Sequence, residues 1–312
     1  MKNSKQIYAE LCEKESIPIY SQHWWLDAVA GEATWDVLIA EEGGHPLAAL
    51  PFVKKRIGPF KLIRMPELTP WLHIWFNVAP NAKYNARLSF EKKHLGELIS
   101  RLPRVHRFHQ KYSYDFQNWL PFHWAGFKQT TRYSYVIDNS TDEQTAFQQL
   151  KKNTRYDIRK AEKKVTVIES DDVQKFLALN KKSFARQAEK ASYADDLVLR
   201  LDAACKRREC RKMLFAVDDE ERLHAAVYLV WDNRSVYYIM GGGDSSLRQS
   251  KANSLLVWEA IKFALAAGKS FDFEGSMIEP IEKFFRSFGA VQKPYFSISK
   301  NRFPMNLIEL VR

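Results

Sequence analysis

The chain is poor in cysteine and acidic residues and has no long apolar run. Its 312 residues include only Cys12, Cys205 and Cys210, too few for a disulfide framework. Cys205 and Cys210 could ligate a metal, but no further ligand lies at metal spacing, so we expect inert thiols and no metal site. No stretch approaches the roughly 18 apolar residues of a spanning helix, and no signal region follows the first residues. These absences predict a cytoplasmic protein without stable membrane insertion.

Acidic residues number 37 against 48 lysines and arginines, so the formal net charge is +11. Such an excess favours anionic partners, whether nucleic acid, phosphorylated substrates or anionic lipid, without choosing among them. The eight histidines form no Ser-His-Asp or metal constellation, and neither a Walker loop nor a dinucleotide fingerprint is present. The charge therefore predicts a negatively charged ligand.

The boundaries between predicted strands and helices are clearest in the second half of the chain. Strands are predicted at 212–217, 224–231, 235–240, 271–274 and 291–299, and helices at 250–267 and 280–287. The glycines 241–243 are expected to break the strand that precedes them. We expect 236–240 and 271–274 to be neighbouring strands that part at one end. Their unpaired amides and carbonyls would then hold an extended acyl group.

The first half repeats this order more weakly. Strands are predicted at 35–40, 46–53, 61–65, 105–109 and 128–137, and helices at 91–102 and 116–124. Between the halves, helices are predicted at 173–184, 194–208 and 141–164, the last starting with a capping box at Thr141, or with Ser140 as its cap. The rhythm predicts an α/β (α+β) protein of two tandem domains, 1–140 and 141–312, each a mixed, mostly antiparallel sheet flanked by helices. One large α/β domain remains the alternative.

Acyl transfer to an amine needs a group that stabilises the developing oxyanion and a group that accepts a proton. Strand period places Asp272 and Glu274 on one face beside the glycines, where they could act as base and orienting group. Arg286, in the helix that begins at Pro280, could hold a phosphate or the oxyanion. The alternatives are a solvated acidic strand face and a solvated helix charge.

A basic helix supplies the predicted donor site. Arg155 and Arg159 are four residues apart and share one helix face, with Lys152 near it and Asn153 at its edge. Guanidinium groups bind phosphate bidentately, so this stripe could grip a diphosphate. A solvated basic helix is the alternative. The predicted substrate-binding set is completed by Tyr238, Arg248, Lys251 and Ser276.

Several stretches resemble the Fem peptidyltransferases and their GNAT-like acyltransferase relatives. They are 24–29 (WWLDAV), 66–70 (PELTP), 153–161 (NTRYDIRKA), 267–275 (AGKSFDFEG) and 284–289 (FFRSFG). The resemblance implies a bacterial protein with twin GNAT-like domains that transfers an acyl or aminoacyl group to an amine. Fem members use aminoacyl-tRNA and build the cross-bridge on peptidoglycan precursors, whereas other relatives use acyl-CoA in polysaccharide or lipid work. It therefore implies acyl-CoA or aminoacyl-tRNA as co-substrate, a small-molecule or cell-envelope acceptor, and no tightly bound cofactor.

The sequence departs from the family pattern at two places. Phe285 stands where the Phe-Lys-x-x-Phe-Gly signature carries lysine, and its neighbour Arg286 points about 100° away on a helix. The segment 248–253 lacks the glycines of the acetyltransferase loop Arg/Gln-x-x-Gly-x-Gly/Ala, which argues against acetyl-CoA in the usual pose. Two alternatives follow: a non-catalytic Fem-like protein that binds an anionic ligand, and, on charge alone, a nucleic-acid-binding protein.

Overall fold

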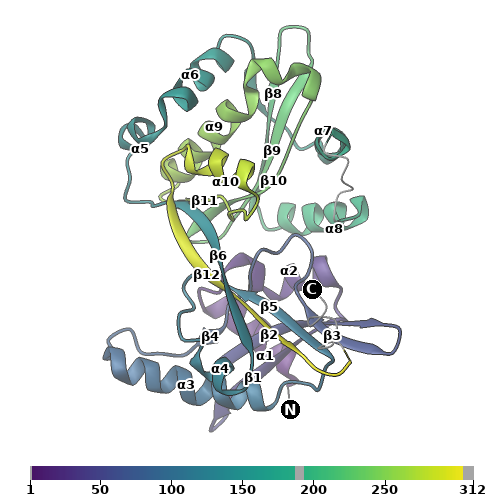
Figure 1. The fold of residues 1–312 in the computed structure, drawn as a ribbon, viewed down its shortest axis with the longest axis vertical. Coiled ribbons are helices and arrows are strands. Elements are labelled where there is room, and N and C mark those ends of the chain that lie inside the picture. The colour runs from purple at the N-terminus through teal and green to yellow at the C-terminus, as the bar shows by residue number, and fades with distance from the viewer. Residues whose placement is uncertain (1, 187–192, 305–312) are drawn as a thin grey trace. The chain divides into compact units, whose positions relative to one another are not determined.

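The computed structural model describes residues 2–186 and 193–304, which form two compact units. Unit 1 comprises Met1–Arg132 and Pro294–Arg312, and unit 2 comprises Tyr133–Lys293. The division differs from the predicted domains 1–140 and 141–312. Strands β6 (Lys128–Ile137) and β12 (Val291–Asn301) each contribute residues to both units. Unit 1 is therefore built from both ends of the chain, which Figure 1 shows in purple and yellow.

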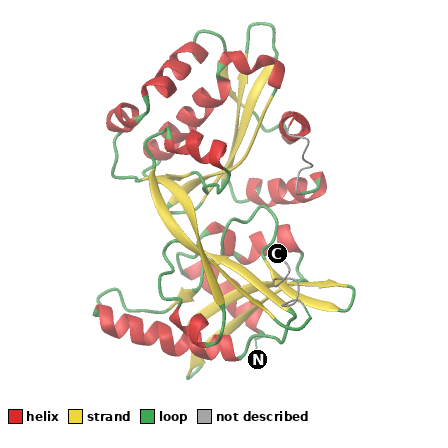
Figure 2. Cartoon of the chain, in the orientation of Figure 1, coloured by secondary structure: helices red, strands yellow, loops and turns green. Residues whose placement is uncertain are grey.

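Unit 1 is a mostly antiparallel sheet with helices packed on it (Figure 2). Its strands follow the order β1 (Trp35–Glu42), β2 (His45–Ile57), β3 (Phe60–Arg64), β5 (Arg107–Tyr112) and β12, and β4 (Trp75–Phe76) also pairs with β2. Only β3 and β5 are parallel among these pairs. The helices are α1 (Ser4–Lys14), α2 (His23–Ala30), α3 (Tyr84–Ser100) and α4 (Leu120–Trp124), with a 3₁₀ turn η1 (Ile19–Ser21).

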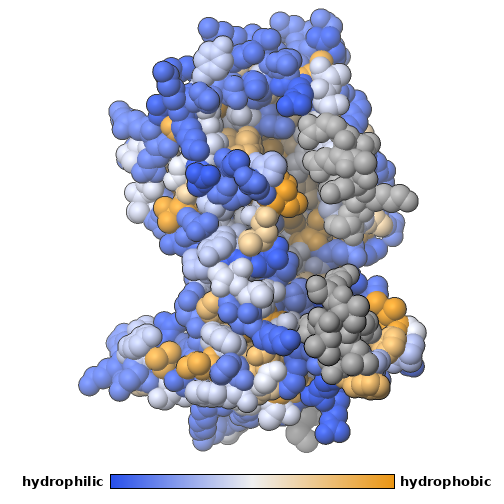
Figure 3. Space-filling view, viewed as in Figure 1, coloured by the Kyte–Doolittle hydropathy of each residue, from blue (hydrophilic) through white to orange (hydrophobic). Residues whose placement is uncertain are grey.

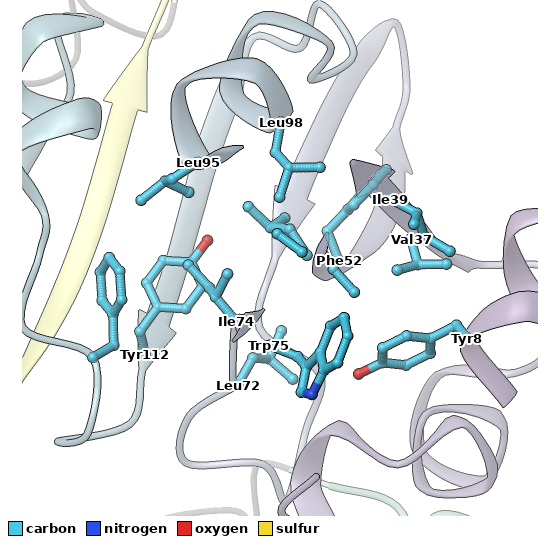
Figure 4. Close-up of a cluster of buried hydrophobic side chains, with 14 of the residues drawn as sticks. Tyr8, Val37, Ile39, Phe52, Leu72, Ile74, Trp75, Leu95, Leu98 and Tyr112 are labelled. Carbon is cyan, nitrogen blue, oxygen red and sulfur yellow. The ribbon is translucent and has the colours of Figure 1, made fainter. Parts of the chain in front are cut away.

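The core of unit 1 lies between α1, α3 and the sheet (Figure 4). On β1, Val37 and Ile39 are buried two residues apart, as expected for one face of a strand. On α3, Leu95 and Leu98 are buried one turn apart. The Tyr8 ring closes the cluster from α1, and its hydroxyl donates to the Ser21 carbonyl at 2.7 Å. The apolar residues thus recur at the strand period on β1 and at the helix period on α3, so that each element has one apolar face in the core.

Unit 2 is a second mixed sheet with helices on both faces. Its strands follow the order β6, β11 (Ser270–Asp272), β10 (Ser235–Gly243), β9 (Leu223–Trp231), β8 (Arg211–Val217) and β7 (Thr166–Glu169). The helices are α5 (Glu143–Gln149), α6 (Lys152–Ala161), α7 (Val173–Arg186), α8 (Asp195–Lys206), α9 (Ala252–Ala266) and α10 (Glu279–Arg286), with a 3₁₀ turn η2 (Ser245–Ser250). Helices α9 and α7 pack on opposite sides of β9 and β10 (Figure 1). The predicted fold class, a mostly antiparallel mixed sheet flanked by helices, is confirmed.

Three local predictions for unit 2 are wrong. The glycines 241–243 do not break a strand, because β10 continues through them and pairs with β9. The predicted helix 141–164 is two helices, since Leu150 and Lys151 have extended backbone with ψ of 142° and 146°. The first of these helices is capped by Asp142, whose carboxylate accepts the Thr145 N–H at 2.8 Å, and not by Ser140 or Thr141.

The surface in view in Figure 3 is mostly hydrophilic, as the charged composition requires. Within 2–186 and 193–304, no helix has both the length and the apolar character to cross a bilayer.

Candidate functional site

Strands β10 and β11 of unit 2 part as predicted. They run parallel and pair only where Ser235 to Tyr237 face Ser270 to Asp272. Beyond Tyr237, β10 continues along β9 to Gly243. The chain after Asp272 leaves toward β6, where the Phe273 N–H donates to the Tyr135 carbonyl at 2.9 Å. A divergence between two central strands is therefore present.

Aromatic rings occupy the space that opens between these strands. Phe285 of α10 packs on Phe273 with ring centroids 4.9 Å apart, and on Tyr238 of β10 at 5.9 Å. Burial raises the pKa of Tyr238 to about 12. Phe285 stands where the family signature has lysine, and its ring forms an apolar wall where β10 and β11 part.

Helix α7 makes hydrogen bonds to the last residues of β10, which follow the predicted strand 236–240. Asn180 Nδ2 donates to the Gly241 carbonyl at 2.8 Å, and the Gly243 N–H donates to Ser183 Oγ at 2.8 Å. These backbone groups, just beyond the predicted strand 236–240, are therefore not free to bind a donor. Two side chains of α7 hold the groups that an acyl donor would need.

The glycines of β10 serve close packing. A Cβ at Gly241 would overlap the Tyr238 hydroxyl oxygen, and a Cβ at Gly242 would overlap the backbone of Asn180. Glycine inside a strand often marks such a close approach. The glycine run thus lets the Tyr238 ring and α7 lie directly on the strand.

Asp272 and Glu274 have different environments at the end of β11. Asp272 is fully buried, and its Oδ1 accepts the Ser134 hydroxyl and the Glu274 N–H, the latter at 2.7 Å. Glu274 lies beyond the strand in the left-handed region, with φ of 59°. The predicted common strand face does not exist, because the alternation of β11 ends at Asp272. Asp272 instead fixes the backbone of Glu274.

The Glu274 carboxyl is the most unusual acidic group of the divergence. Its Oε1 is buried and has no hydrogen-bond partner among the residues that the structure describes. Burial alone raises its pKa well above the ordinary value of 4.5. A carboxyl of raised pKa on a fixed backbone is suited to exchange a proton with a substrate.

A hollow of about 330 Å³ lies at the N-terminus of α9. It is bordered by the ends of β10 and α10, by η2 and by α6. Lys251, the N-cap residue of α9, makes no side-chain cap; the Ala252 N–H donates to Ser250 Oγ at 3.4 Å and the Ser254 N–H to the Lys251 carbonyl at 3.0 Å. The positive end of the helix favours an anion here. Lys251, just before α9, has φ of 67° and takes the left-handed backbone where the acetyltransferase loop carries glycine.

The hollow contains two cations that could meet an anion. The Arg248 guanidinium makes no hydrogen bond or ion pair with any described residue, and Lys251 Nζ lies 3.6 Å from Asp157 Oδ2. Asp244, also on the wall, is engaged by Lys182 at 2.6 Å, and this contact and Ser246 lower its pKa to about 2. The predicted roles of Arg248 and Lys251 therefore remain compatible with their positions.

The sequence analysis missed a histidine in this hollow. His224 lines it, and its Nε2 lies 2.9 Å from Asp218 Oδ2 across the turn between β8 and β9. Its Nδ1 is buried without a partner among the described residues. Contacts from Arg222 and His224 hold the pKa of Asp218 far below its usual range. The Asp218-to-His224 spacing across a predicted hairpin was the available signal.

The basic helix α6 turns its arginines toward α5. Arg155 Nη1 donates to the carbonyls of Gln148 and Leu150, each at 2.7 Å, and the Arg159 guanidinium lies over the Phe147 ring at 5.8 Å. Lys152 and Asn153 are exposed, and only Asn153 of the predicted set on α6 lines the hollow. The structure thus separates Arg155 and Arg159 from the candidate phosphate site.

Arg286 and Ser276 have local partners. Arg286 Nε donates to Glu282 Oε1 at 2.7 Å, and 48% of its side chain is exposed. Ser276 Oγ accepts the Ile278 N–H at 3.0 Å, just before α10. The predicted catalytic cation is therefore neutralised in an exposed ion pair. Within the described part of the chain, no group of three His, Cys, Asp or Glu side chains could hold a metal ion.

Residues 148–277 match the family described as acetyltransferase (GNAT) domain. This segment is a GNAT domain. It contains the hollow at α9, the divergence of β10 and β11, and Glu274, and it ends before α10. The predicted resemblance is thus confirmed for the part of the chain that carries the candidate site. No curated protein matches the sequence significantly.

Solved structures extend the likeness of fold beyond the GNAT domain. FemX is 12% identical with a TM-score of 0.72, over 100% of this chain and 99% of that chain. The C-terminal domain of a putative lysylphosphatidylglycerol synthetase from Agrobacterium fabrum is 11% identical with a TM-score of 0.58, over 98% and 95%. A tandem GNAT protein from the clavulanic acid biosynthesis pathway is 11% identical with a TM-score of 0.52, over 89% and 94%. The chain therefore shares its fold with tandem-GNAT proteins over most of its length.

Proposed function

We propose that this protein transfers an acyl or aminoacyl group from acyl-CoA or aminoacyl-tRNA to an amine, with Glu274 as the proton acceptor. The observation that carries the proposal is the Glu274 carboxyl, buried and unpartnered at Oε1 beside the divergence of β10 and β11. The resemblance to Fem peptidyltransferases supports a cell-envelope precursor as the acceptor.

Both donors carry phosphate groups, and the hollow at α9 is suited to them. The positive end of α9 and the cations Arg248 and Lys251 favour negative charge. β10 connects this hollow with the aromatic wall, because Gly243 lines the hollow and Tyr238 contacts Phe285. An extended donor would thus have its phosphates at α9 and its carbonyl near the wall.

One protein group, the Glu274 carboxyl, is enough for the proton transfers of the proposed reaction. The amine nitrogen attacks the donor carbonyl, and the bond from the carbonyl carbon to the thioester sulfur or ribose oxygen breaks. Glu274 takes the proton that the nitrogen loses and can return it to the leaving group. Asp272 contributes by holding the Glu274 backbone through its N–H.

Donor binding and turnover test the proposal separately. Wild-type protein is titrated with acetyl-CoA and with aminoacyl-tRNA at fixed salt, and transfer to an amine panel is measured by thiol release or by labelled product. The variant R248Q/K251Q should bind the effective donor at least tenfold more weakly. The variant K163Q is the matched control, since Lys163 is exposed and outside the hollow, and it should bind as the wild type does.

The two donors give different outcomes. Product from only one of them identifies the donor class. Stabilisation by an anionic ligand without product from either donor would overturn catalysis and favour the non-catalytic Fem-like binding protein. The Phe285 wall and the ion-paired Arg286 are the observations that favour that second candidate.

A further inference from the structure

A group of basic side chains lies on one face of the sheet of unit 1. His109 and Lys111 are two residues apart on β5, so they share a face, while Phe108 and Tyr112 fill the core on the other face. Both basic side chains are partly buried yet still reach solvent. They belong to neither the GNAT domain nor the hollow at α9.

Neighbouring strands complete this group. The register of β5 and β12 places Ser297 directly opposite Lys111, and His109 Nε2 lies 3.0 Å from Ser297 Oγ. β6 follows β12 in the sheet order, and burial together with the positive charge of its residue Arg132 lowers the pKa of both His109 and Lys111. We call His109, Lys111, Arg132 and Ser297 the Lys111 cluster.

The cations of the Lys111 cluster have no acidic partner. Neither Lys111 nor Arg132 forms a hydrogen bond or ion pair through its side chain with another residue in the described ranges, and Arg132 Nε is buried without an acceptor. Elsewhere the protein pairs its buried cation: Arg211 contacts both Asp171 and Asp202. Burying unpaired cations side by side is unfavourable. An anion from outside would supply the missing charge.

We propose that the Lys111 cluster binds a phosphate group. A phosphate dianion matches the two positive charges, and its three terminal oxygens can accept from the guanidinium fork, the ammonium and the Ser297 hydroxyl together. A carboxylate offers one charge and two oxygens, so it leaves one cation unpaired. Partial exposure restricts the ligand to a phosphate at the end of a molecule or free in solution. The site is independent of the acyl transfer proposed above.

Phosphate binding is tested in a background in which the hollow at α9 is disabled. The variant R248Q/K251Q is titrated calorimetrically with inorganic phosphate at pH 7 and constant ionic strength, and with sodium acetate in parallel. We expect one phosphate to bind and acetate to bind at least tenfold more weakly. Adding K111M or R132Q should weaken phosphate binding at least tenfold, whereas K111R, which keeps the charge, should retain most of it.

The control variant is K93M, since Lys93 is an exposed cation of α3 in the same unit. It should leave phosphate binding unchanged. Circular dichroism and thermal unfolding establish that each variant is folded. The proposal is overturned if R248Q/K251Q binds no phosphate, if K111M and R132Q bind as their parent does, or if acetate binds equally well. None of these outcomes depends on catalysis, so a failure here leaves the acyltransferase proposal standing.

Discussion

The Asp272 carboxylate accepts the backbone N–H of Glu274 at 2.7 Å and holds that residue in a left-handed conformation at the end of β11. The adjoining Gly275 is also left-handed, and a Cβ there would overlap the Tyr133 backbone of β6. The backbone of Glu274 is thereby fixed close to β6. A residue held in an unfavourable backbone region by its surroundings is a common feature of functional sites.

Replacing Glu274 by glutamine should lower activity and raise stability. If Glu274 accepts the proton, the rate of transfer should fall by about 10²–10⁴-fold. Its folded pKa is raised, so wild-type stability is lost as pH rises from 4.5 through the folded pKa, and glutamine removes that loss. Denaturant unfolding from pH 4 to pH 8 should show E274Q gaining on the wild type as pH increases. Wild-type turnover in E274Q would exclude the proposed role.

The contact between Gly241 and Tyr238 predicts a non-additive pair. Gly241→Ala should destabilise by about 1–3 kcal/mol, because the new methyl displaces the Tyr238 ring from its packed position. Tyr238→Phe removes the oxygen that the methyl would overlap, so Y238F/G241A should be more stable than G241A. A thermodynamic cycle by urea unfolding measures this coupling. Gly96→Ala on α3 is the control: a Cβ there meets nothing within 4 Å. Additive effects of the two substitutions would contradict the contact.

Arg286 should behave as an exposed ion-pair residue. Its pair with Glu282 has a counterpart on the same helix, Lys283 with Glu279, also at 2.7 Å and with partners four positions apart. We expect R286Q and K283Q each to change stability by less than about 1 kcal/mol, with similar effects on transfer. Steady-state kinetics of both variants provide the comparison. A selective loss of about tenfold, or 1.4 kcal/mol, in R286Q would instead restore the predicted cation role.

Lys111 should make the stability of the protein depend on alkaline pH. Burial, with a smaller contribution from Arg132, lowers its pKa from 10.5 to about 8. Protonation of Lys111 is therefore less favourable in the folded state than in the unfolded state. The free energy of unfolding falls as pH decreases from 10.5 to 8. In phosphate-free buffer at pH 7, Lys111→Met should raise the free energy of unfolding by about 2–3 kcal/mol, and the difference should vanish above pH 10. K93M should show no such dependence; equal profiles for both variants would contradict the burial of Lys111.

The sequence predicted elements well where apolar periodicity and punctuation agree. Strand β6 was predicted with the observed bounds, and α10 begins within one residue of the predicted start at Pro280. Local propensity failed where a distant contact decides the backbone. The glycines of β10 resemble a break in isolation, yet the Tyr238 hydroxyl and α7 require them inside a strand.

The sequence singled out the acidic residues of the candidate site, but not the contacts that these and the other site residues make. Glu274 was identified as an acid on one face of the predicted strand 271–274, but it lies beyond β11, and its left-handed backbone depends on Asp272 and on the close approach of β6. Helical spacing correctly placed Arg155 and Arg159 on one face, but could not tell that this face meets α5. His224 escaped notice because its partner Asp218 lies on another strand end.

Strand β12 gives this chain a definite order of completion during synthesis. Residues 133–293 are contiguous, so unit 2 can fold once they have left the ribosome. Unit 1 must wait, since β5 acquires this neighbour only when residues 296–301 have been synthesised. A nascent or truncated chain ending at residue 140 would present β5 as an open edge, with backbone groups ready to pair with another molecule. Strand β12 therefore covers an edge of β5 that would otherwise favour aggregation.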